Sequence, residues 1–89
     1  MHDTFLDFKE KKWPLLKKDL KKIVGDTAYN NWLKQLSFIS FKENIITLSV
    51  PTKFLRDWIV NNYSDTIKNE CKKYLLEIDA IKFVVKPLG

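Results

Sequence analysis

The sequence predicts a single small α+β domain with the element order α-α-β-β-α-β. Apolar residues recur every three or four positions over residues 13–24, 26–36 and 53–75, which is the spacing of one helix face. Over residues 45–50 and 81–85 they alternate instead, as they do in strands with one buried face. Of the 89 residues, 45% are hydrophobic and only five are glycine or proline (Gly 2, Pro 3), which allows one modest core.

The first helix is expected to begin near Lys12 or Trp13, because Pro14 is tolerated only in a first turn. Residues 3–10 are expected to form a separate turn before it. Gly25 is expected to end the helix as a C-cap with positive φ. The side facing the core is expected to hold Trp13, Leu16, Leu20, Ile23 and Val24. The opposite arc carries Lys17, Lys18, Lys21 and Lys22.

Asp26 or Thr27 can cap a second, short helix. Its predicted inward residues are Tyr29, Trp32, Leu33 and Leu36. A strand is then expected from Phe38, followed by a polar turn over residues 42–44. The next strand alternates and is expected to bury Ile46, Leu48 and Val50, so that the two strands form a β-hairpin.

Thr52 is placed to cap a long third helix. Its apolar stripe comprises Leu55, Trp58, Ile59, Tyr63, Ile67, Cys71, Tyr74 and Leu75. The stripe continues past Ser64 and Asp65, so one uninterrupted helix is expected. We expect Trp58 in the core, because Leu55 and Ile59 flank it, and we expect Trp32 and Tyr63 there too. A last strand with Ile81, Phe83 and Val85 inward completes a three-stranded sheet with helices packed on it.

The composition argues against most catalytic chemistry. One cysteine cannot form an internal disulfide, one histidine near the terminus cannot anchor a metal cluster, and two glycines cannot build a phosphate-binding loop. We therefore expect no catalytic residue, no metal site and no cofactor, and a binding domain instead. No apolar run approaches the ~18–20 residues that span a bilayer, and no secretory signal is recognisable, so a cytoplasmic location without membrane contact is expected.

The net charge of +5 leaves two interpretations of the lysine-rich helix face open. It is either a solvated surface or a track for the phosphates of single-stranded nucleic acid. The candidate nucleic-acid contacts are Lys17, Lys18, Lys21 and Lys22.

The spacing of several residues resembles the sequence signature of a known protein family. Pro51, Phe54, Asp57, Trp58 and Tyr63 form a signature that is preceded by Trp13 and Trp32 and followed by the strand at 81–85. Over residues 11–86 the chain is similar to the N-terminal domain (domain I) of the DnaA family of bacterial replication initiators. The resemblance implies a fold similar to the KH fold. Residues 1–10 are then an N-terminal extension, either a short turn or disordered, and residues 87–89 a tail or the start of a linker.

The resemblance implies a hub for protein contacts rather than an enzyme, since the family's ATPase and double-strand DNA-binding domains lie C-terminal to this domain. An excised domain or a truncated form is therefore expected. Its implied partners are a DnaB-type replicative helicase, initiation regulators, a second copy and, weakly, single-stranded DNA. Trp13 matches the self-association residue. The implied helicase and regulator contacts are Phe54, with Thr52, Lys53 and Leu55 on the same turn, and Thr27, Ala28 and Tyr29 nearby.

Two residues depart from the family pattern. Some members carry an acidic residue at the position of Ala28, and the usual asparagine after the signature proline is Thr52 here. Phe54 lies at the start of its helix, where Leu55 and Trp58 already fill the inward positions, so it is expected to be half exposed, and partner contact is favoured over core packing. Trp13 is expected either to pack in the core or to support self-association, and Phe5 and Phe8 are candidates to cover it.

Two rival functions remain open at the level of the sequence. One is a single-strand nucleic-acid-binding module that uses the lysine face. The other is a free-standing regulator that mimics the initiator's domain.

Overall fold

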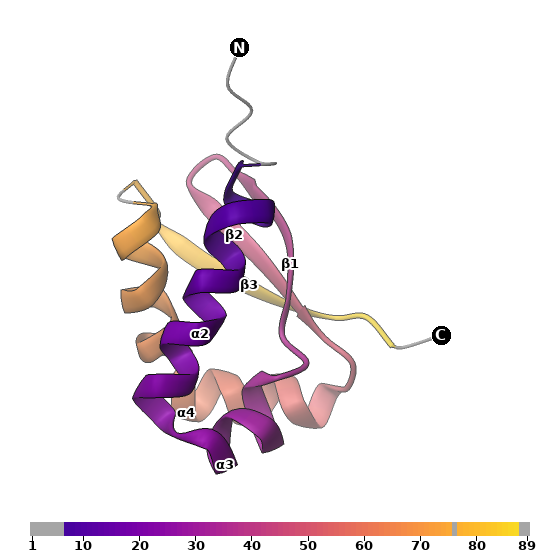
Figure 1. Ribbon diagram of the computed structural model, residues 1–89. Coiled ribbons are helices and arrows are strands. Elements are labelled where there is room, and N and C mark those ends of the chain that lie inside the picture. Colours follow the sequence, from indigo (N-terminus) through magenta and orange to yellow (C-terminus); the bar gives the residue numbers. More distant parts are fainter. Residues whose placement is uncertain (1–6, 76, 88–89) are drawn as a thin grey trace.

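Helices pack against one face of a three-stranded sheet in this computed structural model, which describes residues 7–75 and 77–87 (Figure 1). The predicted order of helices and strands is confirmed. The second helix consists of two adjoining pieces, and a five-residue π-helical turn precedes the first helix. The elements are η1 (Phe8–Lys12), α2 (Trp13–Val24), α3 (Asp26–Ala28), η2 (Tyr29–Leu33), β1 (Ser37–Lys42), β2 (Ile45–Val50), α4 (Lys53–Tyr74) and β3 (Ala80–Val85).

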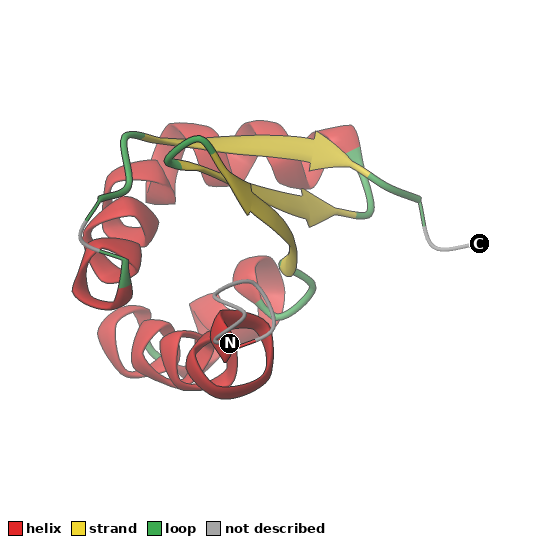
Figure 2. Cartoon of the chain, turned by 90° about the horizontal axis from the view of Figure 1, so that it is seen from above, coloured by secondary structure: helices red, strands yellow, loops and turns green. Residues whose placement is uncertain are grey.

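The central strand of the sheet is β2, with antiparallel β1 on one side and parallel β3 on the other. Glu43 and Asn44 form the hairpin turn with φ of 51° and 64°, the left-handed values that a two-residue turn requires. Ile46, Leu48 and Val50 are buried, as predicted. A parallel pair needs a crossover connection, and α4 supplies it between β2 and β3 (Figure 2).

Helix α2 buries Trp13, Leu16 and Leu20 and ends at Gly25, whose φ of 91° is one that glycine adopts readily. The prediction that Ile23 faces the core is wrong, since its side chain is 52% exposed. Ile23 lies in the last turn of α2, at the edge of the buried stripe, where its side chain is left in contact with solvent.

An aromatic cluster closes the N-terminal end of the core. Phe8 of η1, Trp13 of α2 and Phe38 of β1 have ring centroids 4.9–6.3 Å apart. Phe8 is almost wholly buried, so the packed domain includes η1. The part of the expected extension that falls on residues 1–6, and the tail residues 88 and 89, lie outside the described residues.

Helix α4 runs without a break past Ser64, as predicted, and buries Ile59, Ile67 and Cys71. Burial, with Glu70 next to it, raises the pKa of the Cys71 thiol to about 12, as befits a small core residue. In Figure 1 the first half of α4 lies beside η2 and its second half rises beside α2. None of the helices in the described part of the chain has the length and apolar character to cross a membrane.

One polar contact fastens the far end of α4 to α2. The Tyr74 hydroxyl donates a hydrogen bond of 2.5 Å to the Asp19 carboxylate. This bond is the main reason that the pKa of Tyr74 is raised to about 12, because ionisation would break it and place two negative charges together.

We expect Tyr74→Phe to lower the free energy of unfolding by about 1 kcal/mol at pH 7, since a part-buried hydrogen bond to a carboxylate is lost. A group with a raised pKa in the folded state stabilises below its unfolded pKa, here 10.0, and this contribution disappears as the pH rises toward 12. The difference between wild type and Tyr74→Phe should therefore shrink over that range in chemical denaturation. Tyr63→Phe is the control, and equal effects of the two substitutions at pH 7 would contradict this role.

Candidate docking site

Three aromatic side chains, Trp32, Phe54 and Trp58, form an exposed cluster that we call the aromatic patch. The indoles of Trp32 and Trp58 are stacked, with centroids 4.4 Å apart and planes 19° apart. The ring of Phe54 lies 5.9 Å from that of Trp32. Phe54 is 67% exposed and Trp58 is 38% exposed, whereas Trp32 is half-buried against the core.

The patch exists because two packed elements each contribute aromatic residues to it. Phe54 and Trp58 are four residues apart on α4 and so lie on the same side of the helix, one turn apart. Trp32 comes from η2, which packs beside this half of α4. The prediction that Trp58 is a core residue is wrong, because Ile59 takes the buried position and Trp58 faces the neighbouring arc.

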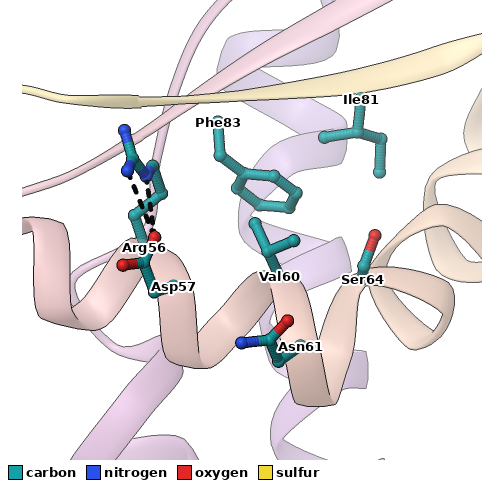
Figure 3. Close-up of a pocket in the computed structure, with 7 residues that line it drawn as sticks. All are labelled: Arg56, Asp57, Val60, Asn61, Ser64, Ile81 and Phe83. Atoms are coloured by element: carbon teal, nitrogen blue, oxygen red, sulfur yellow. Dashed lines mark hydrogen bonds and ion pairs between the residues drawn. The ribbon is translucent and has the colours of Figure 1, made fainter.

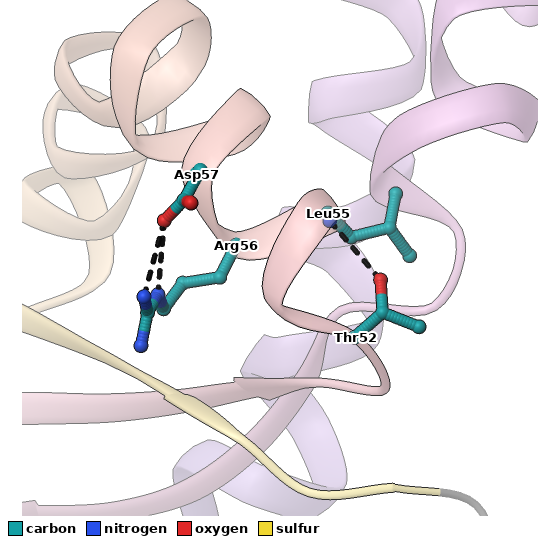
Figure 4. Close-up of polar contacts among 4 residues, drawn as sticks. All are labelled: Thr52, Leu55, Arg56 and Asp57. Atoms are coloured by element: carbon teal, nitrogen blue, oxygen red, sulfur yellow. Dashed lines mark hydrogen bonds and ion pairs between the residues drawn. The ribbon is translucent and has the colours of Figure 1, made fainter.

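The first turn of α4 is fixed by its N-cap. The Thr52 hydroxyl oxygen accepts a hydrogen bond of 3.1 Å from the Leu55 N–H, which confirms the predicted cap (Figure 4). Leu55 is half-buried, while Thr52 and Lys53 are exposed beside Phe54 in sequence. On the following turn the Arg56 guanidinium donates two hydrogen bonds to one carboxylate oxygen of Asp57. This pair is sequence-adjacent and points away from the capping turn (Figure 4).

The other predicted contact residues lie at the start of the second helix. Thr27 is exposed, and Ala28 and Tyr29 are half-buried. The Tyr29 ring lies 5.8 Å from the ammonium groups of both Lys17 and Lys21, on the side of α2, and burial raises the pKa of its hydroxyl. Within the described residues it is Trp32, one turn later, that contacts the Phe54 ring.

Lys17 is half-buried and packs against the chain, unlike the other three lysines of the predicted lysine face. Its ammonium donates hydrogen bonds of 2.6 and 2.9 Å to the carbonyl oxygens of Lys34 and Leu36, just after η2. Burial lowers the pKa of Lys17. The remaining candidates Lys18, Lys21 and Lys22 are exposed, and their contact with nucleic acid stays a prediction.

Trp13 is only 9% exposed, because Phe8 and Phe38 pack around it. The sequence left open whether Trp13 packs in the core or supports self-association, and in the folded chain it packs in the core. Phe8 covers it from η1, and Phe5 lies outside the described residues. Self-association through Trp13 stays a prediction, and it would require this cover to move.

Sequence reasoning assigned Trp32 and Trp58 to the core and so missed two members of the patch. A signal was present, since Phe54 and Trp58 are aromatic residues one helical turn apart, on an arc that Leu55 and Ile59 do not share. Within residues 7–75 and 77–87, no group of three or more His, Cys, Asp or Glu side chains is placed to hold a metal ion.

Comparison with known proteins finds relatives over most of this chain. A family model described as the DnaA N-terminal domain matches residues 10–73. The chain is 36% identical over 76 residues to the chromosomal replication initiator proteins DnaA of Rickettsia massiliae (strain Mtu5) and Rickettsia rickettsii (strain Sheila Smith). It is 34% identical to that of Rickettsia canadensis (strain McKiel) over the same length.

The chain belongs to the DnaA N-terminal domain family. Each of these matches covers 85% of this chain but 16% of the relative, so the chain spans only a small part of the DnaA proteins that it resembles. The matched segment includes η1 from residue 10, α2 to β2 and nearly all of α4. It therefore contains all three residues of the aromatic patch.

Thr52 performs a capping role that asparagine also performs well. We expect Thr52→Ala to lower the free energy of unfolding by about 1 kcal/mol, because the Leu55 N–H loses its partner. Thr52→Asn should retain wild-type stability within a few tenths of a kcal/mol. Urea denaturation of the three proteins measures both effects. If Thr52→Ala is as stable as wild type, the Thr52 cap does not stabilise α4.

The covered position of Trp13 gives a second test. Phe8→Ala should cost about 3 kcal/mol of stability and speed hydrogen exchange at the Trp13 indole N–H, because the ring that covers it is gone. If Trp13 supports self-association, sedimentation equilibrium should show more dimer in Phe8→Ala than in wild type. Phe41→Ala, at a half-buried position without a ring contact to Trp13 among the described residues, is the control. Equal dimer content in all three proteins would rule out Trp13 as the self-association residue.

Proposed function

We propose that this chain is a protein-docking domain of a chromosomal replication initiator, and that the aromatic patch takes up the replicative helicase and initiation regulators. The observation that carries the proposal is the exposure of Phe54 and Trp58 beside the stacked indole of Trp32. Large aromatic side chains are the residues that most often anchor protein interfaces. An exposed cluster of three costs solubility unless a partner covers it.

The patch is built to receive a partner with little rearrangement. Trp32 holds Trp58 by stacking, and the Thr52 cap fixes the turn that carries Phe54. Fewer side-chain rotamers are then left to be frozen when a partner binds, which lowers the entropic cost of association. Thr52 and Lys53 supply a polar rim of the kind that surrounds interface anchors. Thr27 is exposed on α3, the element before η2, and is the third residue assigned to the rim in this proposal.

A patch of this size supports weak individual contacts. Stable interfaces bury roughly 800 Å² on each partner, far more than three aromatic rings offer. Several copies of the domain, brought together on one assembly, would raise the overall strength through effective concentration without any new contact. The helicase and the regulators would compete, because they use the same rings. Self-association through Trp13 would in addition require Phe8, whose ring packs against it, to move.

Titration of the isotope-labelled chain with the N-terminal region of the cognate replicative helicase tests the proposal. Amide and indole NMR shifts are expected around residues 32 and 52–58. Phe54→Ala and Trp58→Ala should each weaken binding at least about tenfold, as interface anchors do when truncated. Phe54→Ala should change the stability by no more than about 1 kcal/mol, because this side chain is 67% exposed. Trp58→Ala should cost more, because it also removes the stacking on Trp32, which contributes about 0.5–1.5 kcal/mol beyond the buried area.

The matched control is Leu15→Ala, which truncates another exposed apolar side chain, on α2. It should bind as wild type does. If Phe54→Ala binds normally while remaining folded, the patch is not the docking site. If shifts appear at residues 18–22 instead and the binding weakens steeply with salt, the lysine face is the contact surface.

A further inference from the structure

A second surface lies on the other side of α4, where this helix approaches the edge strand β3. Five side chains of α4 and two of β3 enclose an open groove of about 400 Å³ (Figure 3). Ile81 and Phe83 point from β3 toward the helix, and Val60 points back toward the strand. Arg56, Asp57, Asn61 and Ser64 complete the lining. We propose that this groove binds an extended acidic peptide, which adds to β3 as a fourth strand of the sheet.

The backbone of β3 is available for such an addition. The strand order β1-β2-β3 leaves β3 with one partner strand among the described residues. Lys86 N–H donates to Val50 C=O, so residues of even number in β3 direct their backbone groups toward β2. Because successive residues of a strand alternate in this respect, Ile81 and Phe83 direct theirs to the free edge. An edge of this kind is a template for another strand.

The groove offers an apolar surface directly beside these backbone groups. Ile81 and Phe83 pair with Ile46 and Leu48 in the sheet, so their side chains lie on the helix-covered face. They are nevertheless only half-buried, and Val60 is 42% exposed. An added strand would point every second side chain into this space. Apolar residues at alternate positions of the peptide fit it, which is how pockets beside a strand edge select a sequence.

Charge decides between an acidic peptide and a second copy of this chain. Lys82 lies in the middle of β3 on the face opposite the groove, and Lys86 follows the strand; both are exposed. Two β3 edges placed together would bring these lysines, and two domains of net charge +5, side by side. Lysines on an edge strand act against such self-pairing. The remaining side chains of an added strand would face Lys82, so acidic residues are favoured there.

The groove and the aromatic patch are separate surfaces. Phe54 and Trp58 lie on the side of α4 next to η2, whereas Arg56, Val60 and Ser64 lie on the side next to β3. Changes in one surface should leave the other intact. Failure of either proposal is therefore distinguishable from failure of the other.

The test is an NMR titration of the 89-residue chain with an acetylated, amidated eight-residue peptide of alternating valine and glutamate. Shifts are expected at residues 56–64 and 80–86. Hydrogen exchange at the Ile81 and Phe83 amides should slow at least about tenfold, because the added strand accepts hydrogen bonds from them. Val60→Asp should weaken binding at least about tenfold by placing a charge in the apolar space. Phe54→Ala, in the aromatic patch, should bind the peptide as wild type does.

Backbone pairing is tested by two further peptides, N-methylated at all valines or at all glutamates. Only alternate residues of an added strand face β3, so one of the two should lose binding and the other should keep it. A peptide with lysine in place of glutamate should not bind.

The proposal is overturned if no shifts appear at millimolar peptide, if both methylated peptides bind, or if the lysine peptide binds as well. It is also overturned if the Ile81 and Phe83 amides become protected in the free chain as its concentration rises, since a second copy would then be the occupant.

Discussion

The burial of one arc of α4 is the constraint on which the rest of the structure depends. Ile59, Ile67 and Cys71 enter the core that α2 and the sheet share, and this fixes the rotation of the helix about its axis. Only Pro51 and Thr52 connect the buried end of β2 to the first turn of α4, so the start of the helix is held close to the strand. With both its start and its rotation fixed, α4 must present Phe54 and Trp58 on one side and Val60 on the other. The two exposed surfaces are consequences of the core.

Much of the fold follows from local patterns that the sequence carries openly. The alternation at 45–50 corresponds to β2. The Thr52 cap and the long stripe through Ser64 correspond to the start and the length of α4. Such features depend on residues that are close in sequence, so period and capping rules predict them. The parallel pairing of β2 with β3 is different, because residues 30 or more positions apart must meet and no local pattern encodes that meeting.

The site was harder to predict for the same reason. The helical period allows Trp58 a place in a broad apolar stripe. In the fold the core takes Ile59, and Trp32 of η2 lies where Trp58 stacks on it. Lys17 belongs to a run of lysines that looks solvated, yet two backbone carbonyls after η2 accept hydrogen bonds from it. These carbonyls carry no sequence signal of their own. In each case a partner distant in sequence determined the role of the residue.

The two surfaces of α4 differ in what holds a partner, and this affects how each tolerates change. In the proposed docking, the aromatic patch would offer side chains alone, so its affinity would rest on a few rings and be sensitive to their truncation. The groove beside β3 offers backbone groups, which every sequence possesses, and its selectivity rests on the apolar space and on Lys82. Under these two proposals, a change at Thr52, which caps the turn of α4 that carries Phe54, would alter docking at the patch and leave strand addition at β3 unaffected. Both surfaces depend on the same buried arc of α4, so a core change at Ile59 would damage them together, whereas exposed substitutions separate them.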